Sequence, residues 1–365
     1  MRILLCGGGT AGHVNPAIAI AQTVLRNAPD SKVAYVVTVN GIENELVDFK
    51  KYQIDVVGLK KGFSVKNFTF IKKMVRAIRE CKIIINEFRP DIIVGTGGFA
   101  TFPVIYAGNK LGVKTVLHES NAIPGKAIKS LSKKVDRIFI NFKETEKYFK
   151  CKTKIIHSGN PIRDGFTSLN KQKVKQSLGI KEKYVVLCMG GSLGATRINE
   201  SAIALIENLI RYRKDIRLIW SCGKREYKEI KNKLKRTGID LLDNVELTDY
   251  IYDMPKKIAV ADVVISRAGA MSISERASSG KCVIFVPSPN VVDNHQLKNA
   301  QTIEKSGGAV VITEDRLYSL TDTVRELISD ADKREMYGRN IETFVQKDSN
   351  KIIYNELVSL IKRTM

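Results

Sequence analysis

The run ILLCGGGTAGH, residues 3–13 of a 365-residue chain, joins an apolar strand directly to a glycine turn and the start of a helix. Ile3–Cys6 is short enough to be a buried strand, and glycine allows the turn to approach a ligand closely. Strand, turn and helix together form the opening unit of a doubly wound sheet. The pattern returns at Tyr184–Met189, which leads into Gly-Gly-Ser-Leu-Gly-Ala. The sequence therefore predicts an α/β fold with two such sheets.

Short apolar runs along the whole chain are predicted as strands, and helical segments separate most of them. They are apolar on both faces, which is typical of buried parallel strands. One sheet cannot hold so many strands, so two domains are predicted: residues 1–163, completed by a C-terminal helix over about 345–365, and residues 164–344. The predicted strands are Ile3–Cys6, Val33–Val39, Asp55–Leu59, Ile92–Val94, Thr115–His118, Arg137–Ile140, Tyr184–Met189, Ile216–Ser221, Val263–Ser266, Val283–Val286 and Ala309–Ile312.

The composition is that of a globular protein, with 44% hydrophobic and 27% charged residues. No run of about 18 apolar residues is present, so no membrane-spanning helix is predicted. The first apolar stretch ends at Gly7, too soon for a signal peptide, which favours a cytoplasmic protein. The six cysteines form no C-x-x-C pair and are predicted to be reduced core residues rather than disulfides or zinc ligands.

The net charge of +22 is unevenly distributed, because residues 1–165 hold 27 basic and 13 acidic side chains. This excess predicts a polyanionic partner: a nucleic acid, an anionic lipid or a phosphorylated substrate. A solvated, lysine-rich surface is the plain alternative. No aromatic-rich basic stretch accompanies the charge, which disfavours a nucleic-acid-binding protein.

Four glycine-containing turns each follow a predicted strand, at residues 7–12, 95–98, 190–194 and 266–272. Backbone N–H groups at such strand-to-helix junctions favour a bound anion. A single turn of this kind is weak support, because tight turns need glycine for packing alone. Four of them in one chain predict a phosphorylated ligand.

The first turn also fits the dinucleotide-binding pattern G-x-G-x-x-G, through Gly7, Gly9 and Gly12. A nicotinamide-dependent oxidoreductase is therefore one alternative. Its fold requires an acid at the end of the second strand to hold the ribose. The second predicted strand ends in Thr-Val-Asn, residues 38–40, without an acid, so nicotinamide binding is disfavoured.

Glu275 follows the last of the four turns and has two interpretations. Its carboxylate can accept hydrogen bonds from both ribose hydroxyls of a nucleotide whose diphosphate lies at the helix N-terminus. Alternatively, it is an acid of the N-terminal turn that complements the helix dipole. Its position beside a glycine turn favours the ribose.

Of the four histidines, His13 is the best candidate for a general base. It follows the first glycine turn at a helix N-terminus, where protonation is disfavoured, so it can take a proton near neutral pH. Glu119 is the second candidate, as a base or as an orienting partner for a histidine. The histidine spacing matches no metal site, and Asp330-Ala331-Asp332 lies away from every glycine turn, so no metal is predicted.

Six motifs follow one another along the chain: GGTAGHVNP (8–16), HESNAIPG (118–125), GNPIR (159–163), GGSLGA (190–195), SRAGAMSISE (266–275) and DNHQ (293–296). Taken in order, they resemble the motifs of the MurG family, the lipid-linked N-acetylglucosaminyltransferases of bacterial peptidoglycan synthesis. The resemblance implies the GT-B fold, two Rossmann-like domains whose parallel sheets face a cleft, and an inverting hexosyl transfer without a cofactor. N-acetylglucosamine would move from UDP to the 4-hydroxyl of N-acetylmuramic acid on undecaprenyl-pyrophosphoryl-muramoyl-pentapeptide, converting lipid I to lipid II.

The resemblance also implies roles for individual residues. The C-terminal domain would hold the donor, and Gly97, Gly98 and Thr101 would meet the acceptor diphosphate. In this last turn the family commonly has Tyr-Val-Ser-Gly where this chain has Phe-Ala-Thr-Phe, residues 99–102, so the acceptor site differs in detail. The implied donor residues are Thr10, Ala11, Gly12, Asn121, Arg163, Ser192, Ile251, Ala270, Met271, Ser272, Ile273, Ser274, Glu275 and Gln296.

A GT-B enzyme that glycosylates another lipid, such as diacylglycerol, is the other alternative, although the segments around Asn121 and Gln296 favour N-acetylglucosamine. The polyprenyl tail of the acceptor stays in the bilayer, which implies work at the cytoplasmic face of the cell membrane. Residues 65–85 are predicted as a basic amphipathic helix that lies on this surface, and an ordinary core-facing helix is the alternative. The apolar stripe of this helix consists of Phe68, Ile71, Val75 and Ile78, with Phe70 and Met74 adjacent, and its cations include Lys72, Lys73 and Arg76.

Overall fold

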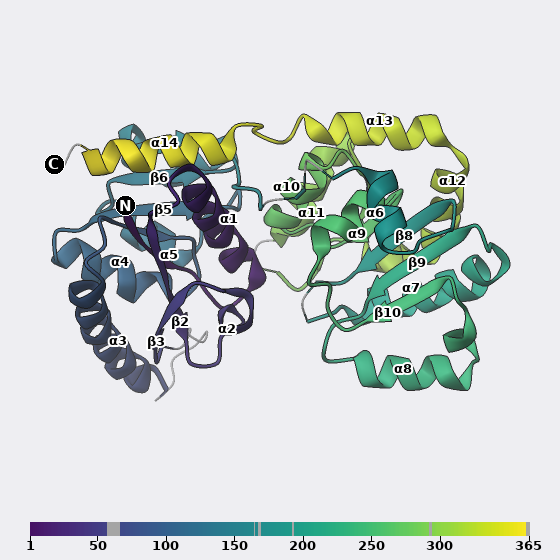
Figure 1. The fold of residues 1–365 in the computed structure, drawn as a ribbon, viewed down its shortest axis with the longest axis horizontal. Helices are drawn as coiled ribbons and strands as arrows, with labels where there is room; N and C mark the ends of the chain where they lie inside the picture. Colours follow the sequence, from purple (N-terminus) through teal and green to yellow (C-terminus); the bar gives the residue numbers. More distant parts are fainter. Residues whose placement is uncertain (57–65, 164, 167–168, 192, 292–293, 363–365) are drawn as a thin grey trace. The chain divides into compact units, whose positions relative to one another are not determined.

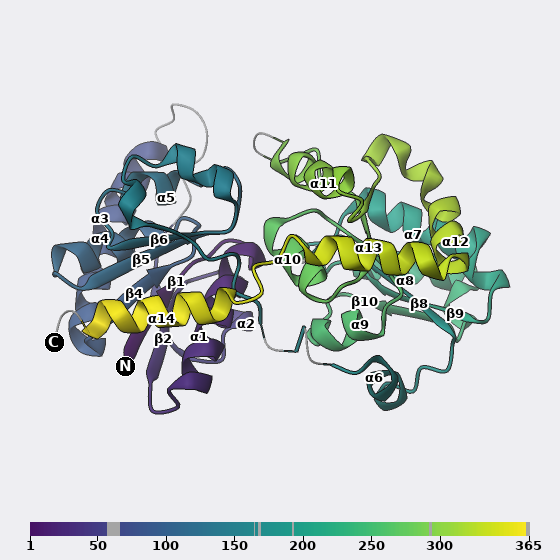
Figure 2. The same cartoon turned by 90° about the horizontal axis from the view of Figure 1, so that it is seen from above.

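The chain folds into two compact units, each with one parallel sheet flanked by helices (Figure 1, Figure 2). Unit 1 consists of Met1–Arg163 and Gln346–Met365, and unit 2 consists of Asp164–Val345. The predicted α/β fold with two parallel sheets is confirmed. The computed structural model describes the chain apart from residues 57–65, 164, 167–168, 192, 292–293 and 363–365.

The sheet of unit 1 has the strand order β3-β2-β1-β4-β5-β6-β7, and all neighbouring pairs are parallel. The direction of winding reverses between β1 and β4, and ligands of such sheets bind where the carboxyl ends of the strands flank this point. The strands are β1 (Arg2–Cys6), β2 (Lys32–Thr38), β3 (Lys50–Ile54), β4 (Ile92–Gly95), β5 (Lys114–Glu119), β6 (Arg137–Ile140) and β7 (Ile155–His157).

Alternate residues of β1 pack against helices on opposite faces of this sheet. Leu4 and Cys6 join the core under α3, α4 and α5, and Ile3 and Leu5 join the core under α1 and α14. A near-continuous apolar strand is therefore the expected sequence for β1, as observed. The helices of unit 1 are α1 (Ala11–Asn27), α2 (Glu43–Leu46), α3 (Lys66–Phe88), α4 (Thr101–Lys110), α5 (Lys126–Leu131) and α14 (Ser349–Lys362).

The C-terminal helix α14 belongs to unit 1, although the whole of unit 2 precedes it in the sequence (Figure 1). Ile353, Leu357 and Leu360 are buried in the same core as the apolar face of α1. Arg137 Nε donates a hydrogen bond to Glu356 Oε1 at 2.6 Å, which ties the helix to β6. The two terminal segments of the chain therefore build one core.

The sheet of unit 2 has the order β10-β9-β8-β11-β12-β13 and is also parallel throughout. Its strands are β8 (Tyr184–Met189), β9 (Ile216–Ser221), β10 (Val245–Thr248), β11 (Val263–Ser266), β12 (Cys282–Phe285) and β13 (Val310–Val311). Its helices are α6 (Lys171–Ser177), α7 (Thr196–Asn208), α8 (Tyr227–Arg236), α9 (Met254–Val260), α10 (Ala270–Ser278), α11 (His295–Lys305), α12 (Leu320–Ser329) and α13 (Ala331–Glu342).

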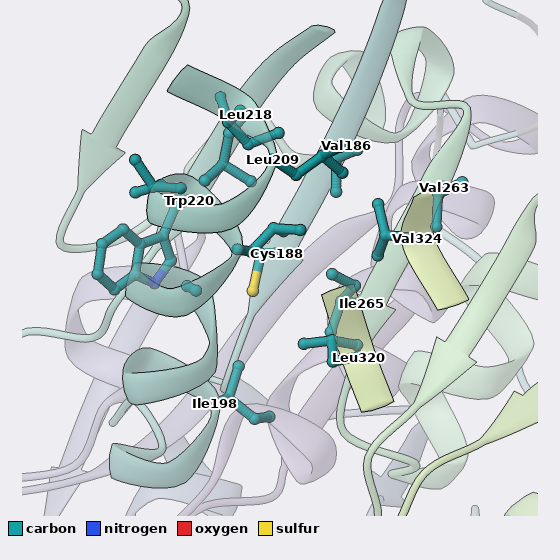
Figure 3. Close-up of a cluster of buried hydrophobic side chains, with 14 of the residues drawn as sticks. Val186, Cys188, Ile198, Leu209, Leu218, Trp220, Val263, Ile265, Leu320 and Val324 are labelled. Carbon is teal, nitrogen blue, oxygen red and sulfur yellow. The ribbon is translucent and has the colours of Figure 1, made fainter. Parts of the chain in front are cut away.

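Apolar side chains of α7, α8 and α12 cover one face of this second sheet, where Figure 3 shows Ile198 and Val324 beside the strands. Trp220, the one tryptophan of the chain, is fully buried there. Its indole N–H donates to Asn199 Oδ1 at 3.1 Å, so its polar atom is satisfied inside an apolar core.

The strand predictions fail at three of the four sheet edges, and succeed at the fourth, where β13 lies within the predicted Ala309–Ile312. The third strand of unit 1 is Lys50–Ile54, whereas the sequence analysis placed it at Asp55–Leu59, and part of that predicted range lies outside the described residues. Two further strands, β7 and β10, were not predicted at all. All three lie at sheet edges, where one side of the strand is solvated and an apolar run is not required.

Candidate active site

His13 lies in the first turn of α1, directly after the glycine turn that follows β1. Its Nδ1 atom lies 3.1 Å from the Gly8 carbonyl oxygen and 3.2 Å from the Thr10 hydroxyl. A carbonyl oxygen can only accept a hydrogen bond, so Nδ1 carries the proton of the neutral ring. The other ring nitrogen, Nε2, therefore keeps a lone pair that can take a proton from a substrate.

The pKa of His13 is lowered below its ordinary value of 6.5, and burial is the largest cause. The hydrogen bond to Gly8 and the charge of Glu43 raise this pKa and offset only part of the effect. The imidazole is therefore neutral at pH 7, which a general base requires. The main cause is burial, whereas the sequence analysis attributed the neutral state to the helix N-terminus.

The glycine turn after β4 lies against the imidazole. Gly97 has a φ of +108°, and a Cβ atom on it would lie 2.7 Å from His13 Cδ2 and 3.2 Å from Nε2. Glycine is therefore required here by both the backbone conformation and the close approach of the ring. Gly8 N donates to Gly97 O at 3.2 Å, which joins this turn to the first one.

Of the three residues implied at the acceptor diphosphate, the two glycines and the threonine lie in different surroundings. Gly97 and Gly98 present backbone close to His13 and Gly8. The Thr101 hydroxyl is fully buried, accepts from Gly97 N at 3.0 Å and donates to Gly97 O at 2.7 Å. Thr101 therefore holds the turn in shape.

Glu119 ends β5 and organises the loop that follows it. Its Oε1 accepts from the backbone N and the side-chain Nδ2 of Asn121, at 2.9 and 3.1 Å. Its Oε2 accepts from Gly125 N at 2.9 Å, at the start of α5. Burial raises the pKa of this carboxyl, and these hydrogen bonds oppose the rise. The contacts fit a residue that positions Asn121, and none of these hydrogen bonds joins Glu119 to a histidine.

The other histidines of unit 1 have structural contacts. His118 is fully buried and bonded through Nε2 to Gly159 O at 3.3 Å, and burial lowers its pKa to about 4. His157 is exposed and its Nε2 lies 2.8 Å from Asn141 O. Within the part of the chain that the structure describes, no three His, Cys, Asp or Glu side chains gather as metal ligands.

An acid does lie at the end of the second strand, contrary to the sequence analysis. Glu43, five residues beyond the strand end, folds back so that Oε1 accepts from Thr38 N at 2.9 Å. The side chain is completely buried and packs against Gly8. The carboxylate is buried and bonded to Thr38 rather than presented to a ligand, so the nicotinamide alternative stays disfavoured.

In unit 2, the turn after β11 leads into the N-terminus of α10. Gly269 is the N-cap residue with an extended backbone, and it has no side chain to cap this end. Ala270, Met271, Ile273 and Ser274 are buried in the first turns of the helix. A helix N-terminus at the carboxyl edge of a parallel sheet can hold an anion on its backbone N–H groups.

Glu275 lies in the second turn of α10 and is buried, so its interpretation as a first-turn acid is wrong. Its Oε2 accepts a hydrogen bond from Arg276 Nη1 at 2.8 Å, and both side chains are almost completely buried. Arg276 Nη2 lies 2.9 Å from Met189 Sδ at the end of β8. Arg276 is not predicted from the sequence, because neighbouring helix residues do not ordinarily face each other.

The third glycine turn, after β8, owes part of its glycine content to packing. A Cβ atom on Gly194 would lie 2.1 Å from Cys222 O, and Gly194 has a φ of +80°. The backbone after β9 therefore requires glycine at this position, whether or not a ligand binds. Ser192, predicted at the donor diphosphate, lies outside the described residues.

Three more of the predicted donor residues are Ile251, Gln296 and Arg163. Ile251 is buried just after β10, so its backbone rather than its side chain is suited to meeting a base. Gln296 lies in the first turn of α11, and its Oε1 accepts from Ser288 N at 3.0 Å. Arg163 is half-buried at the end of the first segment of unit 1.

The predicted membrane helix is α3, and its C-terminal half is a core helix. Ala77, Cys81, Ile84 and Phe88 are buried against the sheet. Val75, predicted in the apolar stripe, is 45% exposed, because this stripe drifts away from the core-facing side of the helix. The side chains of Phe68 and Phe70 lie outside the described residues.

The predicted cations of α3 face solvent or acids. Lys72 and Arg76 are exposed, Arg76 pairs with Glu80 at 2.8 Å, and Lys73 pairs with Asp55 at 2.9 Å. No described helix has the length and apolar character needed to cross a bilayer. From Lys72 onward, α3 is thus a core helix with a basic outer side.

Two family models match successive parts of the chain. The glycosyltransferase family 28 N-terminal domain matches residues 3–140, and the glycosyltransferase family 28 C-terminal domain matches residues 185–352. The crystal structure of Acinetobacter baumannii MurG has a TM-score of 0.70 with this chain, at 23% identity over 98% of this chain and 99% of its own. This likeness confirms the GT-B type of fold.

Curated relatives cover the chain from end to end. A protein of Acetivibrio thermocellus is 35% identical over 370 residues, which are 99% of each chain. A protein of Alkaliphilus metalliredigens is 36% identical over 371 residues, 99% of this chain and 100% of its own. Both are named UDP-N-acetylglucosamine--N-acetylmuramyl-(pentapeptide) pyrophosphoryl-undecaprenol N-acetylglucosamine transferase. The chain therefore belongs to glycosyltransferase family 28 and, within it, to the MurG family.

Proposed function

We propose that this enzyme transfers N-acetylglucosamine from UDP-N-acetylglucosamine to the 4-hydroxyl of N-acetylmuramic acid on undecaprenyl-pyrophosphoryl-muramoyl-pentapeptide. This is the conversion of lipid I to lipid II in peptidoglycan synthesis, on which cell shape and division depend. The names of the relatives supply the donor and the acceptor. The observation that carries the proposal in this chain is His13, whose proton lies on Nδ1 and whose Nε2 lies against Gly97.

The reaction needs a base for the acceptor hydroxyl. The acceptor oxygen attacks the anomeric carbon opposite the UDP, its proton passes to His13 Nε2, and the old carbon–oxygen bond breaks with its electron pair leaving on UDP. Attack from the opposite side inverts the anomeric carbon. A positioned general base of this kind contributes roughly 10²–10⁴-fold to the rate.

The leaving diphosphate gains negative charge as the bond breaks. The N-terminus of α10, Ser192 and Arg163 are proposed to take this charge through N–H and guanidinium groups. The reaction is proposed to proceed without a metal ion. Activity should then persist in excess chelator, and a strict need for manganese or magnesium would contradict this part of the proposal.

The two units are proposed to divide the substrates. Unit 2 holds the donor, with the Ile251 backbone at uracil, Glu275 at the ribose and Gln296 at the sugar hydroxyls. Unit 1 receives the acceptor diphosphate on the Gly97-Gly98 turn. Its residues Thr10, Ala11, Gly12 and Asn121 contact the transferred sugar, and the Glu119 hydrogen bonds hold Asn121 in place for this contact.

The base assignment is tested by His13→Ala. Turnover should fall at least about 100-fold, because the general base is lost, while donor affinity measured by calorimetry stays within about twofold. Glu119→Gln is the matched comparison, because it removes a carboxylate that hydrogen-bonds within its own loop. If His13→Ala keeps turnover within about threefold of the parent, another group is the base.

We further propose that the basic side of α3 brings unit 1 to an anionic membrane at its cytoplasmic face. Each cation near such a surface contributes about 1 kcal/mol to binding. Replacing Lys72, Lys73 and Arg76 with Glu should therefore release the enzyme from anionic vesicles and leave donor affinity unchanged.

The matched control is the same change at three exposed lysines of α8 in unit 2. Equal loss of vesicle binding from both helices would show that net charge, rather than α3, is responsible. Equal binding to neutral and anionic vesicles would show that the basic side of α3 does not bring the enzyme to the membrane. The control residues are Lys228, Lys231 and Lys235.

A further inference from the structure

Glu43 is the first residue of the short helix α2, and its side chain is completely buried. Its Oε1 accepts two hydrogen bonds from Thr38 at the end of β2, from the backbone N at 2.9 Å and from the hydroxyl at 2.6 Å. Oε2 has no hydrogen-bond partner among the residues that the structure describes. A buried carboxylate oxygen without a partner is costly, so its position calls for a functional explanation.

The carboxylate packs directly against the first glycine turn. A Cβ atom on Gly8 would lie 2.9 Å from Glu43 Oε1, and one on Gly41 would lie 2.0 Å from the same oxygen. A side chain at either position would displace the carboxylate from this place. Gly8 is also the residue whose carbonyl oxygen holds Nδ1 of His13. Glu43 thus contacts the turn that fixes the base.

Glu43 supplies the negative charge that acts on His13 within the described structure. Tyr35 donates its hydroxyl to Gly7 O at 2.8 Å, and Cys6 precedes this turn, but burial raises the pKa of both groups, so both are neutral at pH 7. The groups that contact the imidazole itself, from Gly8, Thr10 and Gly97, are uncharged.

We infer that Glu43 is a positioning residue of the transfer reaction: its carboxylate supports the Gly8 turn from beneath and stabilises the imidazolium that His13 becomes. This inference rests on the proposed function of His13. In the step concerned, the acceptor O–H bond breaks, its proton goes to Nε2, and its electron pair forms the new bond to the anomeric carbon while UDP leaves. A negative charge fixed beforehand favours the cation as it forms, without reorganisation during the reaction.

Glu43→Gln is the informative variant, because the amide keeps the shape and one acceptor oxygen and removes the charge. Without the charge, the pKa of His13 should fall by at least about half a unit. The acidic limb of the pH–rate profile should move to lower pH by the same amount, because that limb reports protonation of the base. The plateau rate should fall several-fold, while donor affinity stays unchanged.

The titration of His13 is read directly by NMR of the ring protons, on the full-length protein without substrate. The chain has four histidines, so the signal can be assigned as the one that His13→Gln removes. An unmoved titration midpoint in Glu43→Gln overturns the inference, even if the rate falls, because a purely structural role would lower the rate without moving the midpoint.

Two further variants keep the test decisive. Glu45→Gln removes an exposed charge from the same helix and should leave the midpoint in place, since solvent screens that charge. Glu43→Asp keeps the charge but withdraws it from Gly8, so it serves if Glu43→Gln fails to fold. Its midpoint should fall by a smaller amount, and no fall would again overturn the inference.

The outcomes for Glu43 and for the proposed base are separable. If His13→Gln retains full turnover, the proposed function of His13 fails whatever the titration shows. If His13→Gln loses turnover and the midpoint does not respond to Glu43, the base assignment stands and only the role of Glu43 is lost.

Discussion

Unit 1 and unit 2 bury their acidic side chains in different ways. In unit 2, Glu275 and Arg276 form an ion pair whose side chains are 5% and 3% exposed. In unit 1, the hydrogen bonds to Glu43 and Glu119 come from backbone amides and neutral side chains. All four residues are buried, yet only the pair in unit 2 cancels its own charge.

The difference decides how far each charge acts. A close ion pair has little field beyond its neighbours, whereas a carboxylate held by neutral donors keeps its charge and acts through a medium of low dielectric constant. In unit 1 such a charge acts on His13, a group that changes protonation state in the proposed reaction. Pairing in unit 2 instead fixes a side chain that is proposed to bind ribose.

The largest expected effect comes from breaking the pair in unit 2. Arg276→Met leaves Glu275 buried without its cation and should lower the free energy of unfolding by about 3–5 kcal/mol. Urea unfolding followed by the fluorescence of Trp220 reports this unit, because its core holds the one tryptophan.

Adding Glu275→Gln to Arg276→Met should restore most of this stability, because a neutral pair of this size carries no uncompensated charge. A loss below about 1 kcal/mol in the single variant would contradict the comparison, since exposed ion pairs contribute no more than that.

A smaller effect is expected in unit 1 when the pH is lowered. Burial lowers the pKa of His118 to about 4 from 6.5, so between these values the unfolded chain binds a proton that the folded chain does not. Stability therefore falls as the pH falls through this window, by about 2 kcal/mol at pH 5. Hydrogen exchange of the β5 amides at pH 7 and pH 5 measures it.

His118→Asn should flatten this pH dependence, and the Trp220 transition of unit 2 provides the control in the same samples. A loss that appears equally in both units would show that His118 is not its source.

The smallest effect tests whether the pair in unit 2 has a role beyond stability. The double variant Glu275→Gln/Arg276→Met, once shown to be folded, should bind UDP-N-acetylglucosamine about tenfold more weakly, a change of about 1.4 kcal/mol, because one charge-assisted ribose contact is lost. Calorimetry measures the affinity. Unchanged binding would leave Glu275 only as the structural partner of Arg276.

The sequence predicts the buried strands of both sheets and misses three of the four edge strands, whereas β13 at the fourth edge lies within the predicted Ala309–Ile312. Strands such as β1 and β8 are covered on both faces, so they need an apolar run that can be recognised directly. Lys50–Ile54 pairs with β2 on one side only and is largely exposed, so its residues carry no such pattern. Edge strands are specified by their neighbours rather than by their own composition.

The residues of the candidate site also divide into those that a sequence pattern predicts and those that it does not. Glycine turns and His13 are adjacent in sequence, so their association could be predicted from a local pattern. Glu43 reaches Thr38 and Gly8 only because α2 folds back under the turn, and Arg276 reaches Met189 only through the packing of α10 near β8. Contacts between separate segments of this kind have no signature in a single sequence.

The return of α14 to unit 1 has a consequence for synthesis on the ribosome. Every residue of unit 2 is translated before Ile353, Leu357 and Leu360, which complete the core beneath α1. Synthesis of unit 1 therefore starts first and ends last. The apolar face of α1 at Ile20 and Val24 stays uncovered by α14 through nearly the whole of elongation. The nascent chain carries that uncovered surface for about as long as it remains attached, which is the interval in which chaperones would protect it.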